Sequence, residues 1–373
     1  MWVSGGYQSP LLFFAGAADA AITLRSTADT AVSYDCYLLM PTLFEFVIVL
    51  AFSAVTSAVF EFLGRRLPSA VRLSFAMLLG ITAGHVGYQW CSDLELARAL
   101  GEPSSSAMTR TWASFTQPTE ARLWLPALLL VGLVPAGVIS LLTPGRRPAR
   151  PGDEVPKPSR QLIPSLVSAL IALLAFAGLQ LRMLWGSVYL LSEWSTTNTA
   201  VIIAGIAIVA TFMATFGQLS TSRRYVSLQL LLTAALFGTS GLVFLMSGSK
   251  TIGMLTLSGL GATFALAVMT RLPSREPASS FPAFATVLGF GSHLALAYFY
   301  SELTNVNTAF LILALALITA LPRFPKTWTW RARVAVPTMF TGALLASAIT
   351  NAGMEFRKAT QQQEADPYAE VYQ

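Results

Sequence analysis

The sequence predicts an all-α fold, a polytopic bundle of about ten transmembrane helices. The first observation is composition: of 373 residues, 54% are hydrophobic and only 11% are charged, whereas about 25% of a soluble domain is charged. The second is length, because the apolar residues gather in stretches of about 20, enough for a helix to cross about 30 Å of hydrocarbon. The third is that Lys and Arg gather in every second connection between these stretches.

Composition also limits the classes of partner that the chain can bind. A mean hydropathy of +0.61 excludes a disordered chain, a coiled coil and a nucleic-acid-binding arm. The expected partner is therefore the lipid bilayer, with other membrane proteins or further copies of the chain as additional candidates and no nucleic acid. Because hydrocarbon offers no partner for a free backbone N–H or C=O, and because no ten-residue alternation occurs, the spans are expected to be helices.

The N-terminal segment, residues 1–37, is predicted to lie on the outer face. Its apolar stretch Leu11–Leu24 contains Asp19 and would reach only about 21 Å as a helix. A short interfacial or re-entrant helix and a full span are both open. Ser9-Pro10 is typical of a helix start, because proline is favoured at the first helical position.

The spans follow in two groups. Residues 38–143 form a three-span unit, residues 144–161 a cytoplasmic linker rich in Pro and Arg, residues 162–352 a seven-span unit, and residues 353–373 a polar acidic tail. The expected spans are Leu38–Phe62, Ser69–Cys91, Ala121–Thr143, Leu162–Trp185, Thr199–Gln218, Ser227–Ser247, Thr251–Thr270, Phe281–Tyr300, Asn305–Leu321 and Val334–Ala352.

Two segments carry further expectations. The outer connection Ser92–Glu120 is long enough for a short amphipathic helix at Asp93–Leu100 and a mobile Ser-rich stretch. Gly238-Thr239-Ser240-Gly241, inside the sixth span, is the best candidate for a helix break, of the kind that opens a site in transporters.

The basic residues predict the orientation, because Lys and Arg favour the cytoplasmic side. Most acidic residues lie in the opposite connections and the tails. We therefore expect a multi-pass protein of the cytoplasmic (inner) membrane with both ends outside. The basic residues of the predicted inner connections are Arg65, Arg66, Arg72, Arg146, Arg147, Arg150, Lys157, Arg160, Arg223, Arg224, Arg271, Arg275, Arg323, Lys326, Arg331 and Arg333.

The first two spans form an antiparallel hairpin, in which residues at equal depth have a nearly constant sum of numbers. The register brings Glu61 level with Arg72 near the inner face, and we expect an ion pair that locks the hairpin. It also brings Cys36 level with Cys91 at the outer boundary. A disulfide between them and two unpaired thiols are both open, because disulfides persist in outward-facing compartments and Cys also packs as a small hydrophobe.

The same register places Glu45 level with His85, about 10 Å below the outer boundary. His293, the other of the chain's two histidines, lies at similar depth in the eighth span. Ionisable groups inside a bilayer are costly and are therefore functional candidates. Three hypotheses are open: local hydrogen bonds that fix packing, a proton- or cation-coupling site of Glu45, His85 and His293, or a haem b held by His85 and His293.

The chain has no P-loop, GxSxG, HExxH or CxxC motif, so the sequence favours a non-enzymatic role and predicts no metal site. The function hypothesis is a transporter or permease-like protein with a polar site in the outer half of the bundle. The alternative is a non-catalytic membrane subunit of a larger complex, with or without haem. Neither hypothesis specifies a substrate.

Overall fold

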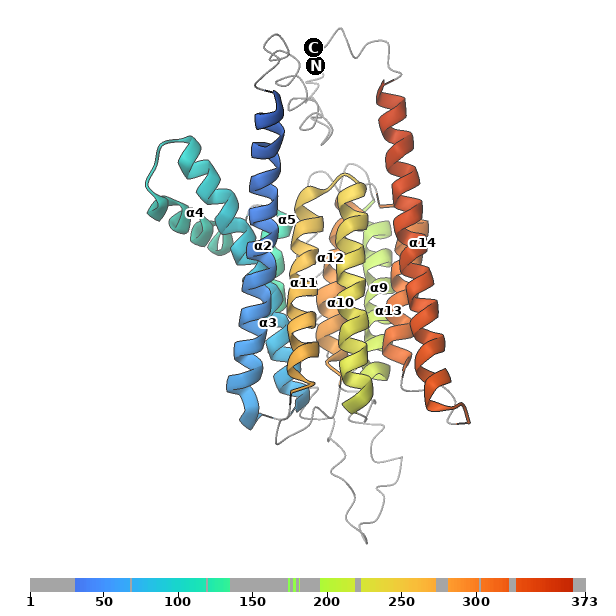
Figure 1. Ribbon diagram of the computed structural model, residues 1–373. Helices are drawn as coiled ribbons and strands as arrows, with labels where there is room; N and C mark the ends of the chain where they lie inside the picture. The colour runs from blue at the N-terminus through green and yellow to red at the C-terminus, as the bar shows by residue number, and fades with distance from the viewer. Residues whose placement is uncertain are drawn as a thin grey trace.

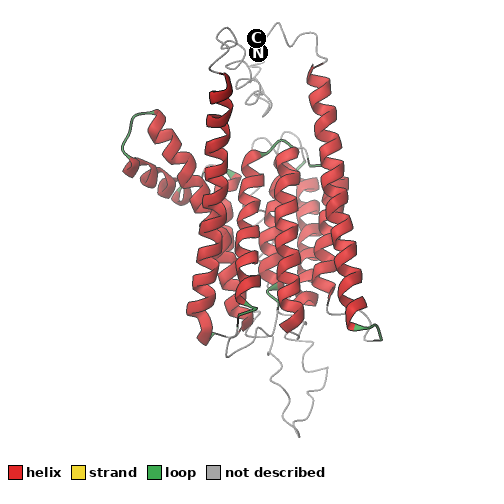
Figure 2. Ribbon diagram, viewed as in Figure 1, coloured by secondary structure: helices red, strands yellow, loops and turns green. Residues whose placement is uncertain are grey.

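The computed structural model describes residues 31–67, 69–118, 120–134, 174, 177–178, 181, 195–218, 223–272, 281–301, 303–321 and 327–364. Every regular element within them is a helix, as Figure 2 shows, and these residues contain no strand. The predicted all-helical class is therefore confirmed for this part of the chain. The N-terminal stretch Leu11–Leu24 with Asp19 and the linker 144–161 lie outside the described residues.

Two groups of helices follow each other along the chain. The first consists of α2 (Ala31–Leu63), the 3-10 turn η1 (Gly64–Arg66), α3 (Ser69–Ala99), α4 (Ser104–Thr116) and α5 (Ala121–Val131). The second consists of α9 (Thr196–Gln218), α10 (Arg223–Met246), α11 (Lys250–Met269), α12 (Ala283–Tyr300), α13 (Asn305–Ala320) and α14 (Trp330–Glu364).

Five of these helices contain a stretch that is long and apolar enough to cross a membrane. Shorter apolar helices occur at Ala121–Val131, Thr197–Ala210 and Asn305–Ala320. Among the described residues, the count of helices with this length and composition is thus smaller than the about ten spans expected. The five stretches are Leu43–Leu63, Tyr225–Met246, Lys250–Met269, Ala283–Tyr300 and Arg331–Ala359.

The long helices run side by side as a bundle (Figure 1). The start of α2 and the end of α14 project from the same end of this bundle, which we call the α4 end because α4 lies near it. The opposite end carries the tight turn at Gly64, and we call it the Gly64 end. Helix α12 lies in the interior, since nearly all of its residues from Ala283 to Phe299 are buried.

Small residues let α2, α3 and α11 approach closely. A Cβ on Gly84 of α3 would lie 2.1 Å from Ser53 Oγ of α2 and 2.5 Å from Ser258 Cβ of α11. A Cβ on Gly261 of α11 would lie 2.8 Å from the carbonyl oxygen of Leu50. Small residues at a helix–helix contact let the two backbones approach closely, a mode of packing that is typical of helices in apolar surroundings.

Two segments are more helical than the sequence predicts. Asp93–Leu100 does not form a helix of its own, because α3 continues without interruption to Ala99. The stretch that starts at Ser104, expected to be mobile, is helix α4. Its buried residues Ala107 and Thr111 pack against α3, and this tertiary contact compensates for the weak helix propensity of the three serines.

Helix α10 has no break at Gly238-Thr239-Ser240-Gly241, so that prediction was wrong. A Cβ on Gly241 would lie 2.8 Å from Leu257 Cδ2, which shows that the glycine serves the contact between α10 and α11. At the C-terminal end, α14 continues beyond the expected span to Glu364, through a stretch that contains several Gln and Glu residues, which are good helix formers.

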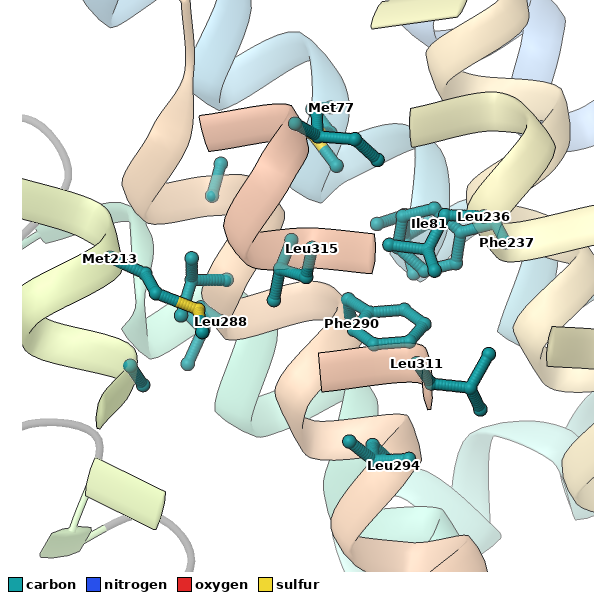
Figure 3. Packing of buried hydrophobic residues seen from close by; sticks show 14 of the residues in the cluster. Met77, Ile81, Met213, Leu236, Phe237, Leu288, Phe290, Leu294, Leu311 and Leu315 are labelled. Carbon is teal, nitrogen blue, oxygen red and sulfur yellow. The ribbon is translucent and has the colours of Figure 1, made fainter. Parts of the chain in front are cut away.

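The core at the centre of the bundle is aromatic. Figure 3 shows Ile81 beside Leu236 and Phe237, with the ring of Phe290 next to them. The rings of Phe237 and Phe290 meet edge to face, with their centroids 5.5 Å apart, an arrangement that the ring quadrupoles favour. Phe237 and Phe290 are fully buried, so the layer of the bundle next to His293 excludes water.

Candidate functional site

His85 and His293 form a direct pair in the interior of the bundle. Nε2 of His85, on α3, lies 2.9 Å from Nε2 of His293, on α12, and the two rings are nearly perpendicular. The residues are 1% and 0% exposed. Phe237 meets the ring of His293 edge to face at 6.1 Å between centroids. Two elements 208 positions apart in sequence thus bring the chain's two histidines together in an apolar surrounding.

The hydrogen bonds define which nitrogens carry hydrogen. Nδ1 of His293 lies 2.6 Å from the carbonyl oxygen of Gly289, which can only accept. His293 Nδ1 therefore donates, and in a neutral ring its Nε2 is the acceptor. His85 must then donate from Nε2, which leaves a lone pair on His85 Nδ1. That atom is buried and makes no hydrogen bond.

A crevice reaches this pair from the α4 end. It is narrow, with an enclosed space of about 10 Å³, room for about one water molecule. His85 is buried while Gln89 and Arg122 are partly exposed, so the imidazole lies at the floor of the crevice. Polar groups that can hydrogen-bond thus line a path from the surface to the histidine pair. The lining residues are His85, Tyr88, Gln89, Phe115, Arg122, Leu123, Pro126 and Leu255.

Glu45 does not meet His85. Its Oε2 lies 3.0 Å from Nζ of Lys250, the first residue of α11, and forms an ion pair with it. The Glu45 side chain is 4% exposed, whereas that of Lys250 is 49% exposed. The register of the two spans predicts only the height of a residue along its helix. The direction around the helix decides its partner, and Glu45 faces α11 while His85 faces α12.

Tyr88 lies between the two groups. It is one turn from His85 on α3 and lines the same crevice, and its hydroxyl oxygen lies 3.4 Å from Oγ1 of Thr251. Thr251 follows Lys250 directly. The polar residues predicted as one site are thus divided into a Glu45–Lys250 pair and a His85–His293 pair, with Tyr88 as the neighbour of both.

Glu61 and Arg72 do meet. Arg72 Nε lies 2.8 Å from Glu61 Oε1, with the side chains only 4% and 9% exposed. The contact closes the hairpin of α2 and α3 next to the turn at Gly64. A Cβ on Gly64 would lie 3.0 Å from Cγ of Arg72, so the glycine leaves room for the arginine stem across the turn.

Cys91 is a free, buried thiol in the structure, and a bridge between Cys36 and Cys91 was only one of the two alternatives left open by the sequence. The side chain of Cys36 itself lies outside the described residues. Cys91 is buried, and the negative charges of Glu45 and Glu95 lie near it. Such an environment disfavours a reactive thiolate.

The histidine pair does not fit the haem hypothesis. Metal–imidazole bonds are about 2.0 Å long, so an iron between the rings requires about 4 Å between the two nitrogens. The observed 2.9 Å is a hydrogen bond, and the perpendicular rings leave no gap for a flat macrocycle. Among the described residues, no group of three or more His, Cys, Asp or Glu could hold a metal ion.

Sequence reasoning missed Lys250, Arg122 and Tyr88. The sequence pattern around Lys250 could have indicated its role, because Lys250 is a single cation at the start of a predicted span. It lies level with the outer ends of the first two spans. For Arg122 the indication is weaker, because it is the second residue of an apolar helix, where a cation opposes the helix dipole and needs another reason.

Comparisons of the chain with models of protein families, with curated proteins and with solved structures find no match in any of the three. The chemistry of the site therefore follows from its geometry alone.

Proposed function

We propose that this chain is a multi-pass protein of a cytoplasmic-type membrane, transporter- or permease-like, with a proton-binding site at His85 and His293. The five long apolar helices support membrane insertion. So do the large apolar side chains exposed along α2 and α14, among them Val47, Val55, Met339 and Phe340, because such faces are soluble only when lipid covers them.

The observation that carries the proposal is the Nε2–Nε2 hydrogen bond at the floor of the crevice. A proton that enters the crevice can bind to the lone pair of His85 Nδ1. This atom is the ring nitrogen of His85 that makes no hydrogen bond. The protonated pair then holds one positive charge shared by two imidazoles. A second proton would place two charges about 3 Å apart in a dry core, so the pair takes up a single proton as a unit.

Histidine suits such a site because an imidazole can both accept and donate a proton. Burial of the pair in an apolar core disfavours its charged form, so the pair takes up a proton only in acid and releases it readily. A relay is also available within the pair, since protonated His85 can pass the Nε2 hydrogen to His293, which already donates from Nδ1 to Gly289. With the Lys- and Arg-rich connections on the cytoplasmic side, the crevice opens outward. Protons would thus enter from outside.

Charge movement after a pH jump tests the proposal. Proteoliposomes on a solid-supported membrane are switched from pH 8 to about pH 4, because burial disfavours the charged form of the pair. We expect a transient current, because the proton crosses part of the membrane to reach His85. We expect no current from a variant carrying both His85→Gln and His293→Gln. The matched control is Gln229→Met, since Gln229 is equally buried but lies on α10 outside the crevice.

A native current no larger than that of protein-free liposomes overturns the proposal, as does an undiminished current in the double histidine variant. Stable co-purification with fixed partners together with that absence of current would favour the membrane-subunit hypothesis instead. Orientation is measured separately with a membrane-impermeant maleimide on a chain without native cysteines. We expect labelling from outside at Ser105→Cys and protection at Arg65→Cys.

A further inference from the structure

The ring nitrogen Nδ1 of His85 is a buried acceptor to which no group in the described part of the chain donates. It makes no hydrogen bond, and His85 is 1% exposed. Because His85 donates from Nε2 to His293, its neutral ring can only accept at Nδ1. Burial of an acceptor without a donor costs free energy, and an ordered water is the usual partner of such an atom.

The crevice beside this atom has the size of one water molecule. Its enclosed space is about 10 Å³, and a cavity needs about 10–15 Å³ by this measure to hold a water. His85, Tyr88 and Gln89 all line it, so the space is bounded by groups that can hydrogen-bond. A solute larger than water does not fit.

Gln89 offers a second acceptor to the same space. It lies one turn after His85 on α3, and residues four apart on a helix have Cβ atoms about 5–6 Å apart, a separation that one water can bridge. The amide nitrogen Nε2 of Gln89 donates to Asp93 Oδ1 at 3.2 Å, because a carboxylate only accepts. The carbonyl oxygen Oε1 of Gln89 makes no hydrogen bond with the described residues.

The contact with α4 holds Gln89 in this orientation. Asp93 is 7% exposed, and Thr111 Oγ1 of α4 donates to Asp93 Oδ2 at 2.7 Å. The carboxylate of Asp93 therefore engages the amide nitrogen of Gln89 and leaves its carbonyl oxygen as the group that Gln89 can offer to the crevice. Asp93 and Thr111 do not themselves line the crevice.

We propose that the crevice binds one water molecule, which donates one hydrogen to His85 Nδ1 and the other to Gln89 Oε1, and that protons reach the histidine pair through this water. The two hydrogens of a water match the two acceptors. The hydroxyl of Tyr88, in the same lining, can donate to the water oxygen. This inference rests on the proposed function and names the proton carrier of that site.

The transfer step needs only the proton, the water and His85. A proton that arrives from solvent makes the water a hydronium ion. One O–H bond of the hydronium then breaks, the lone pair of His85 Nδ1 forms the new N–H bond, and the electron pair of the broken bond stays on the water oxygen. The titratable and charged groups around the pair and the crevice are His293 from α12, Arg122 from α5, Tyr88 from α3, Glu45 from α2 and Lys250 from α11.

An experimental structure of the native chain in lipid nanodiscs, at a resolution that shows ordered water, tests the binding site directly. We expect density for one water at about 3 Å from both His85 Nδ1 and Gln89 Oε1. Well-defined side chains for these two residues with no density between them would overturn the inference. This test needs no variant, so it decides even if substitutions in the crevice prevent folding.

The rate of the pH-jump current tests whether protons use the water. Gln89→Met keeps the length of the side chain and removes the acceptor. We expect the current to rise about tenfold more slowly, because loss of one hydrogen bond lowers the occupancy of the water by a factor of that order. The total charge moved should change far less, since the histidine pair determines it. A current that rises as fast as in the native chain would overturn the inference.

The matched control is Thr111→Val. Gln89 and Thr111 each donate one hydrogen bond to Asp93, so damage to the contact between α3 and α4 would affect both variants. Only Gln89 lines the crevice, and we therefore expect the native rate in Thr111→Val. Equal slowing in both variants would show that Gln89 acts through the helix contact, and this result would also overturn the inference.

The two proposals fail separately. A current with the native rate in Gln89→Met removes the water as the proton carrier and keeps the proton site. Density for the water in a native chain that gives no current confirms the bound water and removes the proton site.

Discussion

The ammonium group of Lys250 lies 3.0 Å from the carboxylate of Glu45 and joins the start of α11 to α2. The carboxylate is 4% exposed and the ammonium group's side chain 49%, so one partner is buried and the other reaches water. Loss of the cation would leave the buried carboxylate without its partner, while the solvation of Lys250 keeps the strength of the pair close to that of an exposed salt bridge.

We expect Lys250→Met to lower the stability of the chain by about 1 kcal/mol, a value near that of exposed pairs because half of Lys250 is solvated. The Glu45→Gln/Lys250→Met double variant should recover part of the loss, since it removes the unpaired charge. Thermal unfolding in detergent of both single variants and the double variant gives the coupling energy. A coupling energy of zero would show that the ion pair does not stabilise the contact of α2 with α11.

The Glu61–Arg72 pair should contribute more to stability than the Glu45–Lys250 pair, because both of its side chains are buried. Removing one partner of a buried ion pair costs about 3–5 kcal/mol, whereas removing both is much milder. We therefore expect Arg72→Met to lower the melting temperature strongly, and Glu61→Gln/Arg72→Met to restore most of it. Equal melting temperatures for the single and double variants would mean that the contact does not lock the hairpin.

Gly84 should not tolerate a methyl group. Its Cβ would lie 2.1 Å from Ser53 Oγ and 2.5 Å from Ser258 Cβ, and overpacking of this kind costs about 1–3 kcal/mol. Gly205→Ala on α9 is the control, because a Cβ there meets nothing within 4 Å and alanine favours a helix by about 0.5–1 kcal/mol. The two variants should shift the melting temperature in opposite directions, and a destabilised Gly205→Ala would contradict this reasoning.

The environment of Glu95 predicts that the stability of the fold depends on pH. It lies beyond the predicted span, and burial together with the negative charge of Glu45 raises its pKa above the ordinary 4.5. A carboxyl group with a raised pKa in the folded state contributes stability that is present below pH 4.5 and is lost as the pH rises through the folded value. Glu95→Gln should thus raise the melting temperature at pH 8 relative to the native chain and leave it nearly unchanged at pH 4.

Local patterns were enough to predict the long apolar helices. The apolar stretches around α2, α10, α11, α12 and α13 coincide with helices in the structure. Long, mostly apolar stretches predict helices because a backbone in hydrocarbon can form only internal hydrogen bonds. Helix α4 escaped because its serines are weak helix formers and its stability comes from packing of Ala107 and Thr111 on α3.

The amino-acid sequence by itself determined the helical class, the residues that are costly to bury, and the heights at which Glu45, His85 and His293 lie along their helices. Only the tertiary structure decided their partners. Height depends on the rise per residue, which is the same in every helix. The partner depends on rotation about the helix axis and on which helix packs alongside, and these follow from close contacts such as those of Gly84 and Gly261. That packing turned Glu45 toward Lys250 and brought His85 to His293.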